Sequence, residues 1–338
     1  MRRKRLHLVI VAAVALAIVG VLGATVVTQG ASAGQAAASG TRASSEPSIW
    51  YINPYEPYPL FAVSQRLFQQ AASKDGYKAS VAGSTKIDIP QQIQLIKQAV
   101  ASGAKAIIFC DLDPATYKAT IRAAQAKGVV MVTTSCVDNI SDYSVGTNNV
   151  KFGQVAAQTI AKGAGSKAQV VVFMVSDSTP NQVASYNAFV AYAKVHYPGM
   201  KVLVREFDGG DPSKTETDLA SLPQSYPSAN AIWFLEGGTL PAVQEGLKQA
   251  GKKPGSIFVL GIDDVPTTIA ALKSGWISET LAQCYFWATP FAAQLALAKI
   301  DGHGPKQQSW PIGLQPVGKA QLPYDGCPAS YIPKLPKG

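Results

Sequence analysis

The chain contains few of the residues that enzymes most often use for catalysis. It has only three histidines, at positions 7, 196 and 303, and they lie far apart in the sequence. It also lacks the P-loop and HExxH motifs, which mark phosphate-binding and metal-dependent sites. Pairs of acidic residues can carry out glycosidase chemistry, so a hydrolase remains an alternative at this point. We expect a protein that is not an enzyme and that needs no cofactor.

Charged residues make up only 15% of the chain, and the basic ones form no dense stripe. The formal net charge is +9, but four of the 30 basic residues, Arg2, Arg3, Lys4 and Arg5, cluster at the N-terminus. Without them, 26 basic residues remain against 21 acidic ones. Nucleic-acid-binding proteins carry a concentrated basic surface. We therefore exclude nucleic acid as a partner.

An apolar stretch over residues 6–27 follows the basic cluster, and Ala31-Ser32-Ala33 then provides the small residues of a cleavage site. This order predicts a signal peptide over residues 1–33 and a flexible tether over residues 34–47. The apolar stretch is also close to the roughly 20 residues that span a bilayer, so a membrane anchor is the alternative. Either way the protein is exported, to the periplasm or the cell surface.

Cysteine is scarce too, with Cys110, Cys136, Cys284 and Cys327. An even number of cysteines in an exported protein favours disulfides. No CxxC spacing supports zinc, and we expect no metal site. Four cysteines allow three pairings. Cys110 and Cys136 each follow an apolar strand-like run, and successive strands are often neighbours, so we expect Cys110 to pair with Cys136 and Cys284 with Cys327.

Four apolar runs in the chain end on an acidic residue. They are Ala106–Asp111, Val170–Asp177, Ala231–Glu236 and Phe258–Asp263. Runs that are apolar at nearly every position are typical of strands buried on both faces, as in parallel sheets covered by helices. Ligands bind beyond the carboxyl ends of such strands. The terminal acids therefore lie at the edge where a binding site is expected.

Strand-like and helix-like runs alternate from Ser48 to Ile300. Several of the helix-like runs end at a glycine, such as Gly76, Gly103 and Gly128, which is a favoured helix stop. This alternation predicts βαβ units and an α/β fold with parallel sheets. The number of units fits two doubly wound three-layer (αβα) lobes, followed by an irregular tail over residues 323–338.

Five short blocks occur in an order that resembles the type I periplasmic binding proteins. The blocks are Pro59-Leu60-Phe61 with Asp75-Gly76-Tyr77, Asp88–Ala99 with Gly103–Ile108, Val145–Asn149, Gly261–Asp264 and Leu281–Gln283. The resemblance is to the ribose-binding-like solute-binding proteins of sugar ABC transporters, and it extends from about Ser48 to Val317.

The resemblance implies two lobes joined by three hinge crossings, with a ligand cleft between them. The expected N-terminal lobe covers residues 48–147 and 285–311, and the C-terminal lobe covers residues 148–284 and 312–322. The crossings are expected near residues 147–149, 281–284 and 310–313. The implied partners are a sugar, polyol or amino sugar and the permease of an ABC transporter, and the protein is expected to be a monomer.

The resemblance also implies the ligand-binding positions. They are Tyr58, Phe61, Asp111, Ser135, Ser185, Phe207, Glu236, Asp263 and Gln283. Phe61 is expected to stack on the sugar, although an ordinary core position would also explain it. Asp263 is expected to accept hydrogen bonds from ligand hydroxyls, although it could instead cap the helix that follows.

Several of these positions depart from the family's pattern. Ser135 and Cys136 stand where the sugar binders carry an Asp-Arg pair, Ser185 stands where they carry an arginine, and Glu236 replaces an asparagine. The inferred pocket then holds three acids, Asp111, Glu236 and Asp263, and no arginine. In a closed cleft these acids would repel one another. A protonated acid, a cationic ligand, a metal or a Glu236 turned to solvent would each relieve this. We expect a ligand that is not a sugar acid or a phosphate.

Other functions share the expected fold. A DNA-binding regulator of the lac-repressor type is excluded because the N-terminus carries an export signal in place of a helix-turn-helix. An exported sensing domain that signals to a membrane kinase, and a binder of an amine-bearing molecule that is not a sugar, remain as alternatives.

Overall fold

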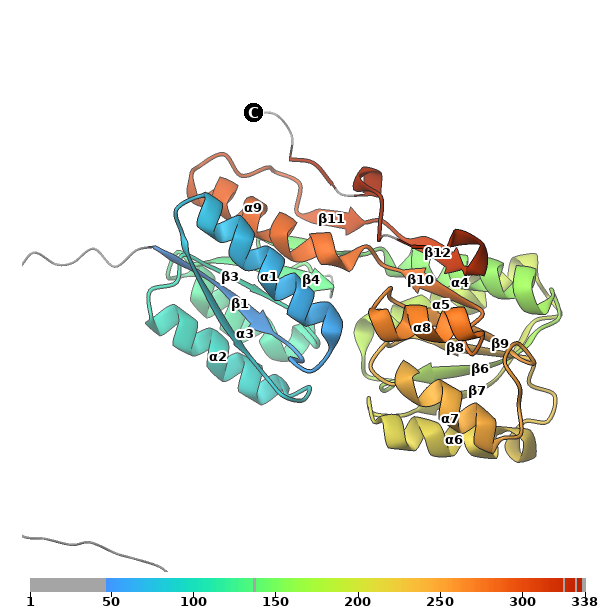
Figure 1. Ribbon diagram of the computed structural model, residues 1–338. Coiled ribbons are helices and arrows are strands. Elements are labelled where there is room, and N and C mark those ends of the chain that lie inside the picture. Colours follow the sequence, from blue (N-terminus) through green and yellow to red (C-terminus); the bar gives the residue numbers. More distant parts are fainter. Residues whose placement is uncertain (1–46, 136–137, 325, 332, 336–338) are drawn as a thin grey trace, which may run out of the picture. The chain divides into compact units, whose positions relative to one another are not determined.

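The computed structural model describes residues 47–135, 138–324, 326–331 and 333–335 (Figure 1). These residues belong to one compact unit that begins at Ser45. The predicted signal peptide, and the tether except for Pro47, lie outside the described residues. Within the described part of the chain, no helix is both long and apolar enough to cross a bilayer.

The first sheet has six strands in the order β11-β5-β4-β3-β1-β2, and all its neighbouring strands are parallel. The strands are β1 (Ser48–Asn53), β2 (Lys78–Gly83), β3 (Ala106–Phe109), β4 (Val130–Ser135), β5 (Tyr143–Thr147) and β11 (Ser309–Ile312). Helices cover both faces. The helices α1 (Pro59–Lys74) and α9 (Ala288–Ile300) share one apolar cluster with the sheet, and α2 (Ile89–Ala101) and α3 (Pro114–Gln125) share another.

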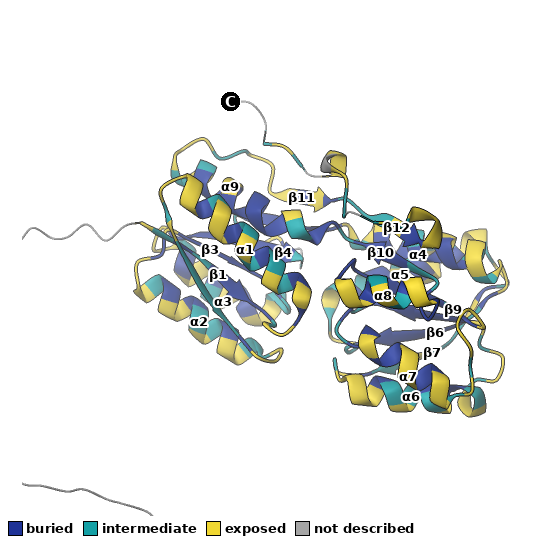
Figure 2. Ribbon diagram, viewed as in Figure 1, coloured by how far each residue is buried: buried dark blue, intermediate teal, exposed yellow. Residues whose placement is uncertain are grey.

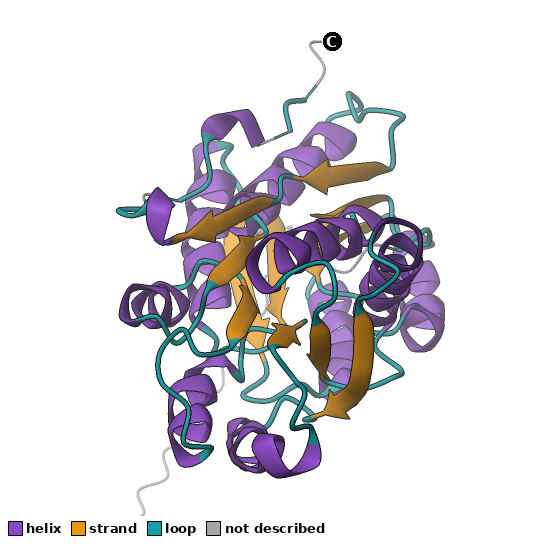
Figure 3. Cartoon of the chain, turned by 90° about the vertical axis from the view of Figure 1, so that its right-hand side faces the viewer, coloured by secondary structure: helices purple, strands orange, loops and turns teal. Residues whose placement is uncertain are grey.

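The second sheet also has six strands, in the order β12-β10-β9-β8-β6-β7. The strands are β6 (Gln169–Met174), β7 (Lys201–Phe207), β8 (Ala231–Phe234), β9 (Phe258–Ile262), β10 (Glu279–Ala282) and β12 (Gln315–Gly318). The helices are α4 (Asn149–Ala164), α5 (Pro180–His196), α6 (Pro212–Ser225), α7 (Val243–Gln249) and α8 (Pro266–Ser274). The central strands are buried, while the helices expose their outer faces (Figure 2). Figure 3 shows the strands flanked by helices in a second view.

The chain passes between the two sheets three times. It does so between β5 and α4, between β10 and α9, and between β11 and β12. The predicted fold of two α/β lobes is therefore confirmed. We call the lobe of the first sheet the first lobe and that of the second sheet the second lobe.

One strand departs from the expected parallel arrangement. The edge strand β12 runs antiparallel to β10. The strand β11 runs parallel to β5, whose end leads into the first crossing. Only two residues, Gly313 and Leu314, separate β11 from β12, so no helix returns the chain to the far side of the second sheet before β12 begins. The chain therefore enters the second sheet from the hinge, and β12 runs antiparallel to β10.

Prolines and capping residues fix where many of the helices begin. Six of the helices have proline at one of their first two positions: α1, α2, α3, α5, α6 and α8. Proline suits this position because its missing N–H would have no partner there. Asp88, Asp113 and Asp211 cap α2, α3 and α6 by accepting a backbone N–H. The helix α6 therefore begins at Pro212, directly after its capping residue Asp211.

A disulfide joins Cys284, which follows β10, to Cys327 in the C-terminal segment. This bond was expected from the sequence. Cys110 is buried and has no disulfide partner among the described residues. Its expected partner, Cys136, lies outside the described residues, so that pairing remains a prediction.

Candidate functional site

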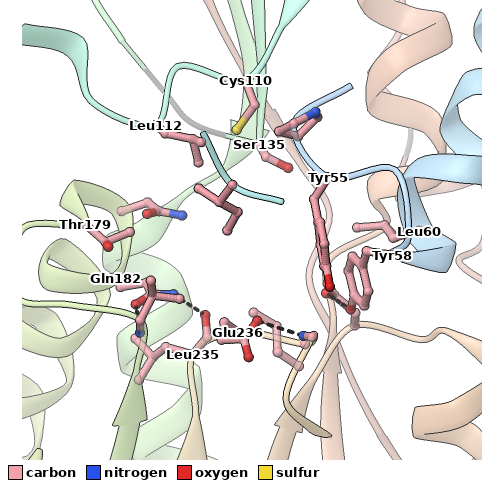
Figure 4. A pocket seen from close by; sticks show the side chains of 18 of the residues that line it. Tyr55, Tyr58, Leu60, Cys110, Leu112, Ser135, Thr179, Gln182, Leu235 and Glu236 are labelled. Atoms are coloured by element: carbon pink, nitrogen blue, oxygen red, sulfur yellow. Dashed lines mark hydrogen bonds between the residues drawn. The ribbon is translucent and has the colours of Figure 1, made fainter. Parts of the chain in front are cut away.

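A cavity of about 340 Å³ lies where the carboxyl ends of strands from both sheets meet. The first lobe contributes residues that follow β1 and β3 and the last residue of β4, and the second lobe contributes residues that follow β6, β8, β9 and β10. In Figure 4, Tyr55, Tyr58 and Leu60 face Thr179, Gln182 and Leu235 across the open space. Two facing sheet edges thus surround one small-molecule-sized space.

Asp263 is the acid of this cavity that is hydrogen-bonded across the two lobes. It directly follows β9, is 4% exposed and has a left-handed backbone with a φ of 65°. One carboxyl oxygen, Oδ2, accepts a hydrogen bond of 2.6 Å from the Tyr58 hydroxyl, and the other, Oδ1, accepts one of 2.7 Å from Gln283 Nε2. Burial raises the pKa of Asp263 to about 6, while these two donors lower it.

These hydrogen bonds link the two lobes. Tyr58 precedes α1 in the first lobe, whereas Asp263 belongs to the second. Gln283 Oε1 in turn accepts a bond of 2.6 Å from Thr147 Oγ1, at the end of β5 in the first lobe. A continuous chain of polar contacts therefore runs from lobe to lobe beside the cavity.

Gly237 makes room for Tyr58. A Cβ atom at this position would overlap the Tyr58 hydroxyl oxygen and would come within 2.8 Å of Asp263 Oδ2. Any other residue at position 237 would push the phenol away from the carboxyl. The absence of a side chain at Gly237 is therefore a requirement of the Tyr58–Asp263 contact.

Glu236 lines the cavity and also holds its own loop in place. Its Oε2 accepts the backbone N–H of Gly238 at 2.7 Å, and its Oε1 accepts that of Thr239 at 2.6 Å. Burial raises the pKa of Glu236 to about 7, against the lowering effect of these hydrogen bonds. The alternative in which Glu236 turns to bulk solvent is not what the structure shows.

Aromatic side chains form the wall of the first lobe. The ring of Phe61 packs edge-on against those of Tyr58 and Tyr285, each with a centroid separation of 5.7 Å. Tyr55 and Tyr58 lie in the loop before α1, beside the cavity (Figure 4). Aromatic faces suit the C–H surface of a sugar or an organic cation.

The two serines among the predicted contact residues, Ser135 and Ser185, both line the cavity. Ser135 ends β4 with a left-handed φ of 66°. Ser185 lies on α5 and is 3% exposed, and its hydroxyl has no hydrogen-bond partner among the described residues. Each serine thus offers a small hydroxyl to the cavity.

Seven of the nine predicted contact residues line the cavity: Tyr58, Phe61, Ser135, Ser185, Glu236, Asp263 and Gln283. Asp111 and Phe207 do not. Asp111 is 2% exposed, and the charge it interacts with most is Asp138. The ring of Phe207 packs against the guanidinium of Arg205, with 5.4 Å between Arg205 Cζ and the ring centroid. The structure therefore gives neither residue the expected place in the pocket.

The structure adds residues that the sequence did not single out. Asp113 lines the cavity while capping α3. Gln182 joins two strand ends, because its Oε1 accepts the N–H of Val175 and its Nε2 donates to the carbonyl of Leu235. Asp113 lies in an Asp-Pro helix start, a detectable signal, whereas Gln182 depends on a contact 53 residues away.

No lysine, arginine or histidine is among the described residues that line the cavity. The charged residues there are the acids Asp113, Glu236 and Asp263. The described residues also contain no group of three or more acidic, histidine or cysteine side chains that could hold a metal ion. The site can therefore offer carboxylates, hydroxyls, amides and aromatic faces to a ligand.

Comparisons with known proteins agree with this geometry. The family model described as a periplasmic binding protein domain matches residues 49–304. The chain is 24% identical over 264 residues to the ribose import binding protein RbsB of Bacillus subtilis, which covers 76% of this chain and 83% of that protein. It is 26% identical over 221 residues to a D-apiose import binding protein of Actinobacillus succinogenes, covering 64% and 69%.

Solved structures show the same fold. A solute-binding protein from Burkholderia graminis, in complex with D-arabinose, has a TM-score of 0.78 at 21% identity and covers 83% of this chain and 98% of its own. One from Agrobacterium vitis, bound to α-D-tagatopyranose, has a TM-score of 0.77 at 20% identity and covers 86% and 100%. The fold, the cavity at the facing sheet edges and the family match over residues 49–304 lead to one conclusion: the chain belongs to the periplasmic binding protein domain family.

Proposed function

We propose that the protein is an extracytoplasmic solute-binding protein that captures a sugar-like or polyol ligand between its lobes and delivers it to the permease of an ABC transporter. The observation that carries the proposal is the Tyr58–Asp263–Gln283–Thr147 hydrogen-bond chain, which joins the lobes beside the cavity. A ligand hydroxyl bonded to Asp263 would contact the same chain. Ligand binding would thereby favour one relative position of the lobes.

The relatives support the same assignment. The curated proteins are named as import binding proteins for ribose and apiose. The site of this chain keeps an aromatic wall, an acid after β9 and a glutamine after β10. These groups supply what a neutral hydroxylated ligand requires: an apolar stacking face, an acceptor and an amide.

Ligand binding can be tested by thermal shift of residues 46–338 against pentoses, hexoses, polyols and their amino derivatives. A ligand at 100 times its Kd stabilises a protein by about 2.7 kcal/mol, which moves the melting temperature measurably. Asp263→Ala should abolish the shift. Asp211→Ala is the matched control, since Asp211 caps α6 outside the cavity. The proposal fails if no compound in the panel shifts the melting temperature, or if Asp263→Ala responds like the parent chain.

Delivery to a permease needs a separate measurement. Deleting the gene should abolish uptake of the radiolabelled ligand into cells, and the Asp263→Ala variant should not restore it. Normal uptake in the deletion strain, together with a changed transcriptional response to the ligand, would instead indicate a sensing role.

A further inference from the structure

The cavity carries an excess of negative charge that nothing in its lining balances. Asp263 is buried and Glu236 is partly buried, and the cavity lining also contains the acid Asp113 but no cationic side chain among the described residues. Burial, followed by the charges of Asp263 and Glu236, raises the pKa of the neighbouring Tyr58 well above its usual value. At pH 7 Asp263 is mostly ionised, because its pKa is about 6. Closing the cleft on a neutral ligand would leave its charge uncompensated.

Hydrogen bonds do not remove this imbalance. Each oxygen of Glu236 and of Asp263 already accepts one hydrogen bond, from Gly238, Thr239, Tyr58 or Gln283. None of these four donors carries a positive charge. A further neutral hydroxyl would add a hydrogen bond but no compensating charge. An ammonium group would add both, and hydrogen bonds between opposite charges are about twice as strong as neutral ones.

The aromatic wall from the first lobe also suits a compact ligand that carries a positive charge. Tyr55, Tyr58 and Phe61 line the side contributed by the first lobe. Aromatic rings attract organic cations through their electron-rich faces. Across the cavity, Ser185 is 3% exposed and presents a hydroxyl without a partner among the described residues. That hydroxyl can bond a neutral part of the same ligand.

We propose that the natural ligand is an amino sugar or amino polyol with one protonated amine, and that Glu236 and Asp263 bind the ammonium group while the first-lobe aromatic residues pack against the carbon skeleton. This inference rests on the proposed function, because it specifies the ligand of the same site. Such a site differs from a neutral-sugar site because it requires a positive charge on the ligand.

The test compares amines with their neutral parents by isothermal titration calorimetry at pH 7. The pairs are D-glucosamine with D-glucose, D-galactosamine with D-galactose, and 1-amino-1-deoxy-D-sorbitol with D-sorbitol. At least one amine should bind ten times more tightly than its parent. Equal or tighter binding of the neutral parents overturns this inference and leaves the proposed function standing. Binding of no compound in the panel, neutral or cationic, contradicts both.

Asp263→Asn separates charge from structure. Asparagine tolerates the left-handed backbone of position 263. Its carbonyl oxygen can still accept from Gln283, and its amide can donate to the Tyr58 oxygen. The preference for the amine over its parent should fall at least tenfold, with neutral-sugar affinity changed less than threefold.

The matched control is Asp211→Asn, which removes one negative charge from an exposed helix cap outside the cavity. Asparagine caps helices about as well as aspartate, so this variant should keep the full amine preference. If Asp263→Asn also keeps it, or weakens the amine and its neutral parent equally, recognition does not depend on the charge of Asp263 and the inference is wrong.

Discussion

In the first lobe, Cys110 and Asp111 follow β3; in the second, Asp263 follows β9, and Gln283 and Cys284 follow β10. Both regions put an acid and a cysteine at the carboxyl ends of buried parallel strands. In the second lobe the acid has two hydrogen-bond donors and the cysteine is in a disulfide. In the first lobe, the described residues include no disulfide partner for the thiol and no hydrogen-bond partner for either oxygen of Asp111. Similar sequence signals thus lead to an acid that lines the cavity in the second lobe and to a buried acid outside the cavity in the first.

The first expected difference concerns the cysteines. The Cys284–Cys327 bond closes a segment of 43 residues, and the chain-entropy estimate for such a loop is about 4 kcal/mol. The double variant Cys284→Ala, Cys327→Ala should therefore lose about 2–4 kcal/mol in urea unfolding. Cys110→Ala, the first-lobe counterpart, should lose about 1 kcal/mol. A loss of several kcal/mol in Cys110→Ala would instead favour the predicted Cys110–Cys136 bond.

The second expected difference concerns pH. Burial, reinforced by the nearby Asp138 carboxyl, raises the pKa of Asp111 to about 8. Asp138 already accepts from the backbone of Ile140 and from the backbone and hydroxyl of Ser141, so Asp111 is the acid that takes the proton. The folded state then holds a proton that the unfolded state releases above its pKa of about 3.9. The contribution of Asp111 to stability therefore falls as pH rises from about 4 to 8, by up to about 1.4 kcal/mol per pH unit.

Asp111→Asn removes this dependence and keeps the shape of the side chain. In urea unfolding at pH 5, 6, 7 and 8, the unfolding free energy of the variant should rise relative to that of the parent chain as pH rises. For Asp263→Asn, the unfolding free energy should rise relative to the parent chain only up to about pH 6, because the pKa of Asp263 is about 6. Parallel stability curves for Asp111→Asn and the parent would contradict the assignment of the proton to Asp111.

The different fates of these two acids show what the sequence could and could not reveal. The apolar runs and glycine stops predicted the strands, the helices and the two lobes, because burial on both faces leaves a direct mark on composition. The positions of Asp263 and Gln283 followed from the family's spacing. The sequence could not show that Asp111 turns toward Asp138, since the segments that hold them are 27 residues apart. Nor could it show that β12 runs antiparallel, because that depends on a two-residue connection.

A third change tests the close packing of the second lobe. Gly237→Ala would place a methyl group against the Tyr58 hydroxyl, so the phenol must leave Asp263. We expect a loss of about 1–3 kcal/mol in unfolding free energy. In a Tyr58→Ala background, most of this cost should disappear, and a double-mutant cycle measures the coupling. Additive costs would show that Gly237 and Tyr58 act independently.

The smallest expected effect comes from removing a single hydroxyl group. Tyr58→Phe keeps the ring against Phe61 but deletes the donor to Asp263 Oδ2. That donor lowers the pKa of Asp263, so the variant should raise it, and stability at neutral pH should fall by about 1–2 kcal/mol. Carboxyl ¹³C chemical shifts can follow the Asp263 titration directly. Tyr55→Phe is the control, because Tyr55 lines the same wall but, unlike Tyr58, is not a hydrogen-bond donor to Asp263 among the described residues. If the Asp263 titration is the same in both variants, the tyrosine hydroxyl does not support the carboxylate, and the contrast with Asp111 must come from Gln283 alone.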